Sequence, residues 1–286
     1  MRIFFLSFFS FLFSVFLGAI LPSSGYAARA TVPAVKSGHA LVVDQSSGEI
    51  LFEKGADEVT AIASITKLMT AMVLIDSGLP LLETITITKA DVDRFKGSKS
   101  KLRVGTQLLR AEALKLALMA SENRAASALA TSFPGGKEAF VEAMNQKASS
   151  LLMSDTIFVD ATGLRPGNVS TASNLAKLVD AASQYPLIRQ YSTAKLFDLK
   201  AKRGKRNVNL RYVNSNRLIK NSRWKISVSK TGYISESGKC LVMKTEIAGR
   251  PIVMVLLDSW GKLTRLGDAN RVKKWLENRS SYKPKT

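Results

Sequence analysis

The chain has 286 residues, 46% of them hydrophobic, and a formal net charge of +20. The apolar content suffices for a full buried core and excludes a mainly disordered chain. The charge predicts attraction to polyanions. No helix-turn-helix, zinc-finger or single-strand-binding motif accompanies it, so nucleic acid is not an expected partner. The one cysteine, Cys240, excludes an intrachain disulfide and is expected to be a small buried core residue, and the one histidine, His39, excludes a zinc site with several histidines.

The first 27 residues follow the pattern of a secretory signal peptide. Arg2 supplies a positive charge, an apolar run extends from residue 3 to 21, and Gly25 and Ala27 are small residues suited to a cleavage site. An uncleaved membrane anchor is the alternative, because the run is nearly long enough to span a bilayer. Pro22 and the small residues favour cleavage after Ala27. We therefore expect export to the periplasm, with loose, charge-driven contact to the wall or a membrane surface.

Residues 28–37 are small and polar and are expected to be flexible, followed by one catalytic domain over 38–280 and a short basic tail over 281–286. The domain is predicted to open with a β-hairpin over 39–54, a helix from Ser64 to Asp76 and a short strand over 84–88. Residues 89–107 are expected to be mostly loop. Two helices over 110–133 should meet near Ser121, and a further helix covers 135–153.

The second half of the chain turns from helix to strand. A helix over 170–185 is predicted, with Ser170 or Thr171 as its cap and Pro186 as its stop. The base-rich stretch 200–211 is interpreted as a solvated loop, with a polyanion-facing surface as the alternative. A three-stranded antiparallel meander over 224–259 and a helix from Leu266 to Glu277 complete the chain. This order predicts an α/β fold, with an antiparallel sheet built from both ends of the chain, flanking helices and an inserted helical lobe.

The chemistry centres on the stretch ASITKLMTAM, in which Ser64 precedes Lys67 by three residues. Positions three apart lie on one face of a helix. A lysine among apolar side chains loses proton affinity and can act as a base, and a helix N-terminus favours developing negative charge. By itself the pair is a weak signal, because Ser-x-x-Lys is frequent by chance and a helix cap with a surface lysine is the more common explanation.

Two further motifs favour the catalytic interpretation. Ser121 and Asn123, in the sequence SEN, interrupt an apolar helical stretch, where a hydroxyl could relay a proton and an amide could hold a substrate carbonyl. Lys230, Thr231 and Gly232 close a predicted strand, offering a charge, a hydrogen bond and close backbone approach to a substrate. Glu122, between the first two, is interpreted as a solvated carboxylate.

Ser-x-x-Lys, Ser-x-Asn and Lys-Thr-Gly, in this order, resemble the penicillin-binding and class A β-lactamase serine enzymes. The stretches IASITKLMTAMVLID, LALMASENRAASALA, FVDATGLRPGNVSTASNLAKLV and SKTGY are similar to the D-alanyl-D-alanine carboxypeptidase/endopeptidase family, and most so to its short periplasmic endopeptidases. The resemblance implies a β-lactamase/transpeptidase-like fold, no cofactor and no metal. It also implies peptidoglycan stem peptides and cross-links as substrates and β-lactams as covalent inhibitors.

The same resemblance implies a role for each motif residue. Ser64 is then the acyl-forming nucleophile and Lys67 its base, with Ser121 and Asn123 as proton relay and substrate holder. Lys230 and Thr231 would bind the substrate carboxylate, beside Gly232, and the backbone N–H groups of Ser64 and Tyr233 would form the oxyanion hole.

Three alternatives differ in what the site does. A class A β-lactamase needs a Glu-x-x-x-Asn loop, which residues 154–212 lack, so rapid β-lactam hydrolysis is not expected. A carboxypeptidase that trims terminal D-alanine shares every motif with an endopeptidase that cuts cross-links; the short C-terminal end, SSYKPKT, which could not form a membrane helix, favours the endopeptidase. A non-catalytic wall-binding protein is disfavoured by the intact motifs.

Overall fold

The computed structural model describes residues 32–281, so the predicted signal peptide and its cleavage site lie outside the described residues. Within that range no helix is both long enough and apolar enough to cross a membrane. Lys36 and Ser37, at the end of the segment expected to be flexible, donate backbone hydrogen bonds to the carboxylate of Asp268 at 2.9 and 2.8 Å.

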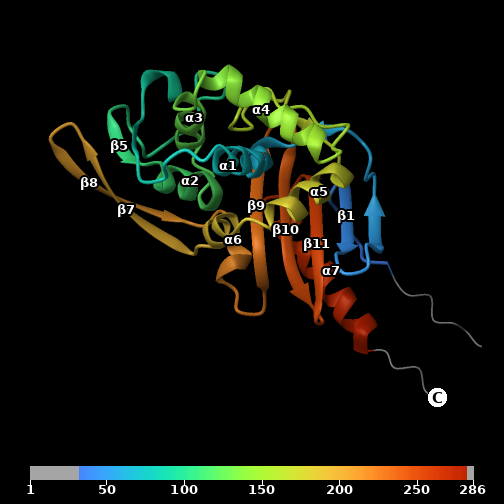
Figure 1. Cartoon of the computed structure of the whole chain (residues 1–286). Coiled ribbons are helices and arrows are strands. Elements are labelled where there is room, and N and C mark those ends of the chain that lie inside the picture. The colour runs from blue at the N-terminus through green and yellow to red at the C-terminus, as the bar shows by residue number, and fades with distance from the viewer. Residues whose placement is uncertain (1–31, 282–286) are drawn as a thin grey trace, which may run out of the picture. The chain divides into compact units, whose positions relative to one another are not determined.

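A five-stranded antiparallel sheet, in the order β2-β1-β11-β10-β9, forms the centre of the fold (Figure 1). The first hairpin of the chain pairs with its last strand, and Val42 lies opposite Met254. The sheet is therefore assembled from both ends of the chain, as the order of elements predicted. Its strands are β1 (His39–Asp44), β2 (Ile50–Lys54), β9 (Lys225–Ile234), β10 (Gly238–Ile247) and β11 (Arg250–Ser259).

Alternating side chains of the sheet enter two separate hydrophobic clusters. Along β11, Met254 and Leu256 pack with α7 (Thr264–Ser281), whereas Val253 and Val255 join the larger cluster on the opposite face. This alternation is the period of two expected for a strand buried on both faces. The larger cluster contains α5 (Ala172–Ala182) and also Cys240, which is fully buried as expected.

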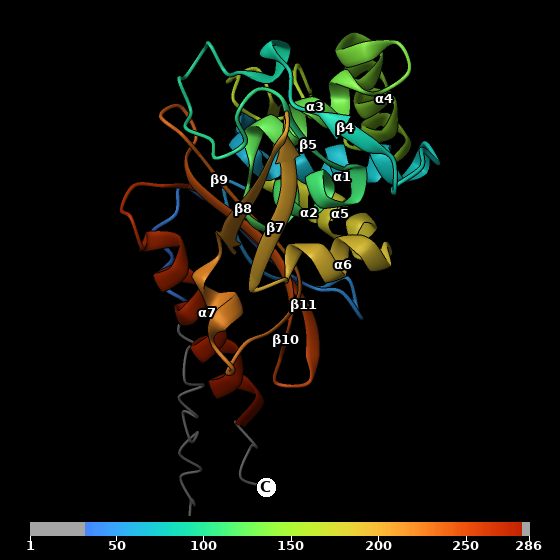
Figure 2. The same cartoon turned by 90° about the vertical axis from the view of Figure 1, so that its left-hand side faces the viewer.

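A helical lobe adjoins the sheet on the α5 side, and Figures 1 and 2 show its helices grouped together. Its central helix, α1, carries buried residues along almost its whole length. The helices α2 and α3 are separated by the short turn that contains Ser121, as predicted. The helices of the lobe are α1 (Lys67–Asp76), α2 (Arg110–Met119), α3 (Asn123–Thr131) and α4 (Gly136–Ser150).

The base-rich stretch 200–211, predicted to be a loop, is instead part of a long hairpin. Its strands are β7 (Leu196–Arg203) and β8 (Arg206–Val213), and Gly204, with φ of +58°, lies in the turn. They extend a four-stranded sheet with β4 (Thr84–Thr86) and β5 (Thr106–Leu109) (Figure 2). The loop prediction was wrong because it weighed the charges and overlooked the alternation. Leu199 and Ala201 are buried, while Lys200 between them and Lys202 after them are exposed.

The remaining elements are short. Pro186 was predicted to stop a helix, and it does follow α5, but it also begins another, because proline is tolerated at the first helical position. Thr171 is the cap of α5 and accepts a hydrogen bond from the backbone N–H of Asn174. The short elements are β3 (Thr60–Ala61), the 3-10 turns η1 (Ala63–Thr66), η2 (Lys89–Asp91) and η3 (Arg217–Lys220), β6 (Val169–Ser170) and α6 (Pro186–Ser192).

Candidate active site

Ser64 lies in the turn η1, directly before α1, where the lobe meets the edge strand β9. The predicted helix thus begins as a 3-10 turn. Ala63 has a φ of +46°, a conformation that L residues rarely adopt. Such strain persists only where the surroundings enforce it and is frequent at functional sites. No side-chain cap bond is present at the start of η1 or α1, so Ser64 is not a helix cap.

Lys67 is fully buried, as the catalytic interpretation required. Its Nζ lies 2.8 Å from Ser64 Oγ, 2.7 Å from Asn123 Oδ1 and 2.5 Å from the carbonyl oxygen of Thr162. A neutral amine has two N–H donors and one lone pair. The amide and carbonyl oxygens can only accept, so they take both N–H groups. The lone pair of a neutral Lys67 is then left for the hydroxyl hydrogen of Ser64.

Burial lowers the pKa of Lys67 from its ordinary value to about 7. Desolvation is the largest cause, since a low-dielectric environment disfavours the ammonium. The negative charges of Asp160 and Glu122 act in the opposite direction and hold the pKa up. A lysine with a pKa near neutrality is populated as a free base under physiological conditions, which a proton acceptor needs.

Glu122 differs from its predicted state, because it is buried, with 8% of its surface exposed. Its carboxylate accepts a hydrogen bond from the backbone N–H of Arg124 at 3.2 Å and so caps α3. Burial raises the pKa of this carboxyl. The prediction of a solvated carboxylate was wrong because the turn between α2 and α3 folds inward, toward Lys67.

Ser121 and Lys230 form a second polar pair beside the first. Lys230 is 1% exposed, and its Nζ donates to Ser121 Oγ and to the carbonyl oxygen of Thr231, both at 2.8 Å. Burial, followed by the nearby positive charges of Lys67 and Arg265, lowers the pKa of Lys230 well below its ordinary value. Among the described residues no hydrogen bond joins Ser121 to Lys67, so Ser121 approaches the second lysine more closely than the first.

The edge strand β9 brings the third motif next to the nucleophile. A Cβ placed on Gly232 would lie 3.0 Å from the carbonyl oxygen of Ile62 and 3.1 Å from the backbone nitrogen of Ser64. Glycine therefore allows β9 to approach η1 closely, whereas the sequence had suggested that Gly232 makes room for a substrate backbone. Thr231 Oγ1 donates to Ser215 Oγ at 2.7 Å, and the side chain of Tyr233 is 60% exposed. An edge strand can pair with an extended peptide.

Several contacts in the site come from residues that the motif search missed. The side chain of Ser215 contacts Thr231, the Oγ of Ser98 accepts from Asn123 Nδ2 at 3.1 Å, and Arg265 Nη1 donates to the carbonyl oxygen of Gly232 at 3.3 Å. Thr162 contributes only its backbone carbonyl. A backbone group leaves no side-chain signal, so no motif search could have found it.

His39 lies away from Ser64. The Nδ1 of His39, on β1, lies 3.6 Å from a carboxylate oxygen of Glu58, not beside Ser64. The described residues contain no group of three or more His, Cys, Asp or Glu side chains that could hold a metal ion. Among residues 32–281, Lys67 is the only titratable group in contact with Ser64 Oγ.

The fold and the site together define a class: a serine acyl-transfer enzyme of the penicillin-binding kind. The chain belongs to the D-alanyl-D-alanine carboxypeptidase family, whose model matches residues 26–261.

Individual relatives agree with the family assignment. A protein of Pseudomonas aeruginosa named D-alanyl-D-alanine endopeptidase is 48% identical over 241 residues, which cover 84% of this chain and 77% of that protein. An Escherichia coli K12 protein of the same name is 43% identical over 251 residues, covering 88% and 80%. The crystal structure of the Streptomyces K15 DD-transpeptidase is 26% identical with a TM-score of 0.79 and covers 86% of this chain and 98% of its own.

Proposed function

We propose that this chain is a serine DD-peptidase that hydrolyses the D-alanyl cross-links of peptidoglycan through an acyl-enzyme on Ser64. The buried contact between Lys67 Nζ and Ser64 Oγ carries this proposal. It supplies a nucleophile and a base of suitable pKa within 2.8 Å of each other.

Acylation follows from that contact. Ser64 Oγ attacks the carbonyl carbon of the D-alanine, and its proton passes to the lone pair of Lys67. The oxyanion that forms accepts hydrogen bonds from the backbone N–H groups of Ser64 and Tyr233, the second contributed by β9. The C–N bond then breaks, and the amine leaves with a proton that Lys67 or Ser121 returns. Water cleaves the resulting ester and restores Ser64.

The neighbouring polar groups hold the substrate. Asn123 directs its Oδ1 at Lys67, so its Nδ2, now on Ser98, is the group that can donate to a substrate carbonyl. Thr231 can offer its hydroxyl to a substrate carboxylate, while Ser215 keeps that hydroxyl in place. Lys230 is buried beneath Ser121 and supports the site through the hydrogen bond that its Nζ donates to the Ser121 hydroxyl.

Two activities share this chemistry and differ in the leaving group. The endopeptidase assignment is supported by the names of the relatives from Pseudomonas aeruginosa and Escherichia coli. The description of the family supports the alternative, a carboxypeptidase that releases terminal D-alanine. Mass spectrometry of cross-linked muropeptide dimers and pentapeptide monomers after incubation separates the two. Loss of terminal D-alanine with intact dimers would reject the endopeptidase.

β-Lactams are the expected covalent inhibitors, because their strained amide can acylate the same serine. Fluorescent penicillin should label the wild-type protein and not the Ser64→Ala variant; labelling that survives this substitution would reject Ser64 as the nucleophile. If the wild-type protein also fails to label, the alternative of a wall-binding protein without catalysis would remain. In place of a Glu-x-x-x-Asn loop, residues 160–168 place the carbonyl of Thr162 against Lys67. The label should therefore persist.

We further propose that the protein works in the periplasm after cleavage at Ala27, held loosely to the wall or a membrane by its positive charge. The sequence pattern of residues 1–27 and the net charge support this. N-terminal sequencing of the exported protein tests it, and a sequence that starts at Met1 would contradict cleavage.

A further inference from the structure

A cavity of about 870 Å³ adjoins the Ser64–Lys67 pair. Two direct partners of Lys67, Asn123 and Thr162, line it. Its other walls are η2 with the four residues that follow it, one face of α3, the start of α4 and the loop around Arg165. The motifs described above occupy only the edge of this space, and none of them accounts for the rest.

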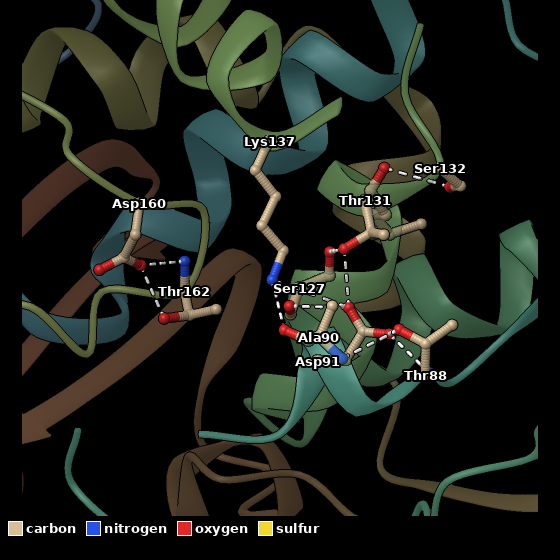
Figure 3. A network of polar contacts seen from close by, with 10 residues as sticks. Thr88, Ala90, Asp91, Ser127, Thr131, Ser132, Lys137, Asp160 and Thr162 are labelled. Carbon is tan, nitrogen blue, oxygen red and sulfur yellow. Dashed lines mark hydrogen bonds and ion pairs between the residues drawn. The ribbon is translucent and has the colours of Figure 1, made fainter. Parts of the chain in front are cut away.

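Three of the four acidic side chains that line the cavity accept hydrogen bonds from the protein itself, whereas the fourth, Glu138, makes no hydrogen bond or ion pair within residues 32–281. Asp160 Oδ1 accepts from the backbone N–H groups of Thr162 and Gly163 at 2.5 and 2.7 Å. Asp91 is buried and accepts from the hydroxyls of Ser127 and Thr131 at 2.9 and 2.8 Å (Figure 3).

Asp93 behaves in the same way. Its carboxylate accepts from the backbone N–H groups of Phe95 at 2.8 Å and Ser98 at 2.7 Å. These three carboxylates therefore shape the walls of the cavity, by fixing the turns that form it.

The basic side chains of the cavity are not satisfied in this way. Lys137 extends from α4 between the Asp160 loop and the Asp91 cluster, and its Nζ bonds one neutral acceptor, the carbonyl oxygen of Ala90 at 2.6 Å (Figure 3). Its distance to Asp91 Oδ1 is 4.0 Å.

Three more cations line the same space. Within residues 32–281, the side chains of Lys89, Arg94 and Arg165 make no hydrogen bond or ion pair. The guanidinium carbon of Arg165 lies 6.0 Å from the ring centre of Phe95, which holds the group loosely over the cavity wall. Lys89, Arg94 and Arg165 thus offer three positive charges without internal partners, against the one unpartnered carboxylate of Glu138, and this excess suits an anionic group.

We propose that this cavity binds a carboxylate of the peptidoglycan stem peptide, with Lys137 and Arg165 as the recognising cations; the inference rests on the proposed function, which brings such a peptide to Ser64. A stem peptide carries free carboxylates on residues that precede its D-alanine. A carboxylate is a stronger acceptor for an ammonium than the carbonyl of Ala90, and it pairs with a guanidinium through two parallel bonds. Contact here would hold the peptide while Ser64 attacks.

Binding of a peptide without a scissile bond tests the cavity separately from catalysis. The probe is a synthetic tripeptide of the stem residues that precede the D-alanine, and it ends at a diamino acid. It is used in two forms, one with free carboxylates and one with every carboxylate amidated. Isothermal titration of the wild-type protein should give about tenfold weaker binding for the amidated peptide, as loss of one charge-assisted contact predicts. Equal affinities, or no binding of the free peptide, would overturn the proposal.

Variants locate the effect. Lys137→Ala and Arg165→Ala should each weaken binding of the free peptide by about tenfold and reduce the preference over the amidated peptide. Lys177→Ala is the matched control, because Lys177 Nζ likewise bonds a single backbone carbonyl, that of Leu152 at 2.5 Å, outside the cavity. Unchanged binding in both cavity variants, or equal loss in the control, would contradict the assignment. If a cavity variant does not fold, the comparison of the free and the amidated peptide on the wild-type protein still tests the proposal.

The same samples separate this proposal from the proposed function. Labelling with fluorescent penicillin reports on Ser64 and should be retained in all three variants. Failure of wild-type labelling together with a preserved preference for free carboxylates would reject the peptidase and keep the binding site. Normal labelling and cross-link cleavage without that preference would reject the binding site alone.

Discussion

At the scale of single residues, the state of Lys67 determines what this site can do. Its three neighbours are one hydroxyl and two oxygens that only accept. This set matches a neutral amine that holds the hydroxyl hydrogen of Ser64, and a charged ammonium in the same place would donate to Ser64 and block proton transfer. Burial, which lowers the pKa to about 7, is therefore part of the chemistry.

The pH dependence of acylation follows from this pKa. Only neutral Lys67 can accept the proton, so the rate of penicillin acylation should rise as pH increases through about 7 and level off above it. Stopped-flow fluorescence with a labelled penicillin between pH 5.5 and 9 measures this. A rate that is constant or falls across this range would argue against Lys67 as the base.

The same burial should appear in stability. Between the folded pKa of about 7 and the unfolded value of 10.5, the unfolded chain binds more protons, so wild-type stability should rise with pH in that window. Lys67→Met removes the titrating amine. The free energy of unfolding of this variant should therefore lack the wild-type rise of about 1 kcal/mol per pH unit. Urea unfolding of both proteins at pH 6, 7 and 9 tests it. Below pH 7 the difference in free energy of unfolding between the two proteins should be constant. A pH dependence of this difference below pH 7, or no pH dependence above it, would contradict a Lys67 pKa of about 7.

At the scale of elements, the loop 160–168 and the edge strand β9 both pack closely against η1 and fix the position of the Ser64 backbone. A Cβ on Gly163 would lie 1.9 Å from the carbonyl oxygen of Ala63, whereas a Cβ on Gly232 would lie 3.1 Å from the nearest atoms of η1. The loop therefore cannot keep its position with any larger residue at 163. The strained φ of Ala63 is understandable as the result of this packing.

Gly163→Ala should slow acylation by tenfold or more, since a shift of about 1 Å in a reacting group has effects of this order. Gly204→Ala is the matched control: Gly204 also has a positive φ, but a Cβ there would meet nothing within 4 Å. The control should lose about 1 kcal/mol of stability from backbone strain and keep its acylation rate. Penicillin acylation and urea unfolding of both variants give the comparison. Equal acylation by the two would mean that the loop does not position Ser64.

At the scale of the whole molecule, the two ends of the described chain are joined by one buried carboxylate. Asp268, on α7, accepts from the backbone N–H groups of Lys36 and Ser37 and from the Ser37 hydroxyl, and it pairs with Arg271. Ser37 immediately precedes β1, which lies in the sheet beside β11. The carboxylate therefore fastens the first strand to the last helix.

Asp268→Ala should lower the free energy of unfolding by about 3 kcal/mol, because it leaves Arg271 and two backbone N–H groups without their partner. Asp198→Ala is the control, since Asp198 also pairs with an arginine, Arg211, but on the exposed face of β7 and β8. Exposed ion pairs contribute little, so that variant should melt at the wild-type temperature. Thermal unfolding followed by circular dichroism compares them. Equal losses in both variants would show that the carboxylate does not fasten the two ends.

Local periodicity explains how much of the fold could be predicted. The first hairpin, the helices on either side of Ser121 and the final meander each have a strong alternation or a helical repeat in the sequence, and the structure confirms them. The β7–β8 hairpin was missed because its charges obscured a real alternation of buried Leu199 and Ala201 with exposed Lys200 and Lys202. The identity of the serine and lysine pair came from the order of three short motifs.

The sequence by itself determined the family and which side chains are candidates for the chemistry, because residue type and spacing are local properties. Only the tertiary structure decided their environment. The carbonyl of Thr162 that faces Lys67, the inward position of Glu122 and the pairing of Lys230 with Ser121 all join segments distant in the chain or depend on how a turn folds. The pKa of Lys67 belongs to the same group, since it follows from desolvation by the whole surrounding core. A sequence pattern specifies neighbours along the chain, whereas burial and charge are set by neighbours in space.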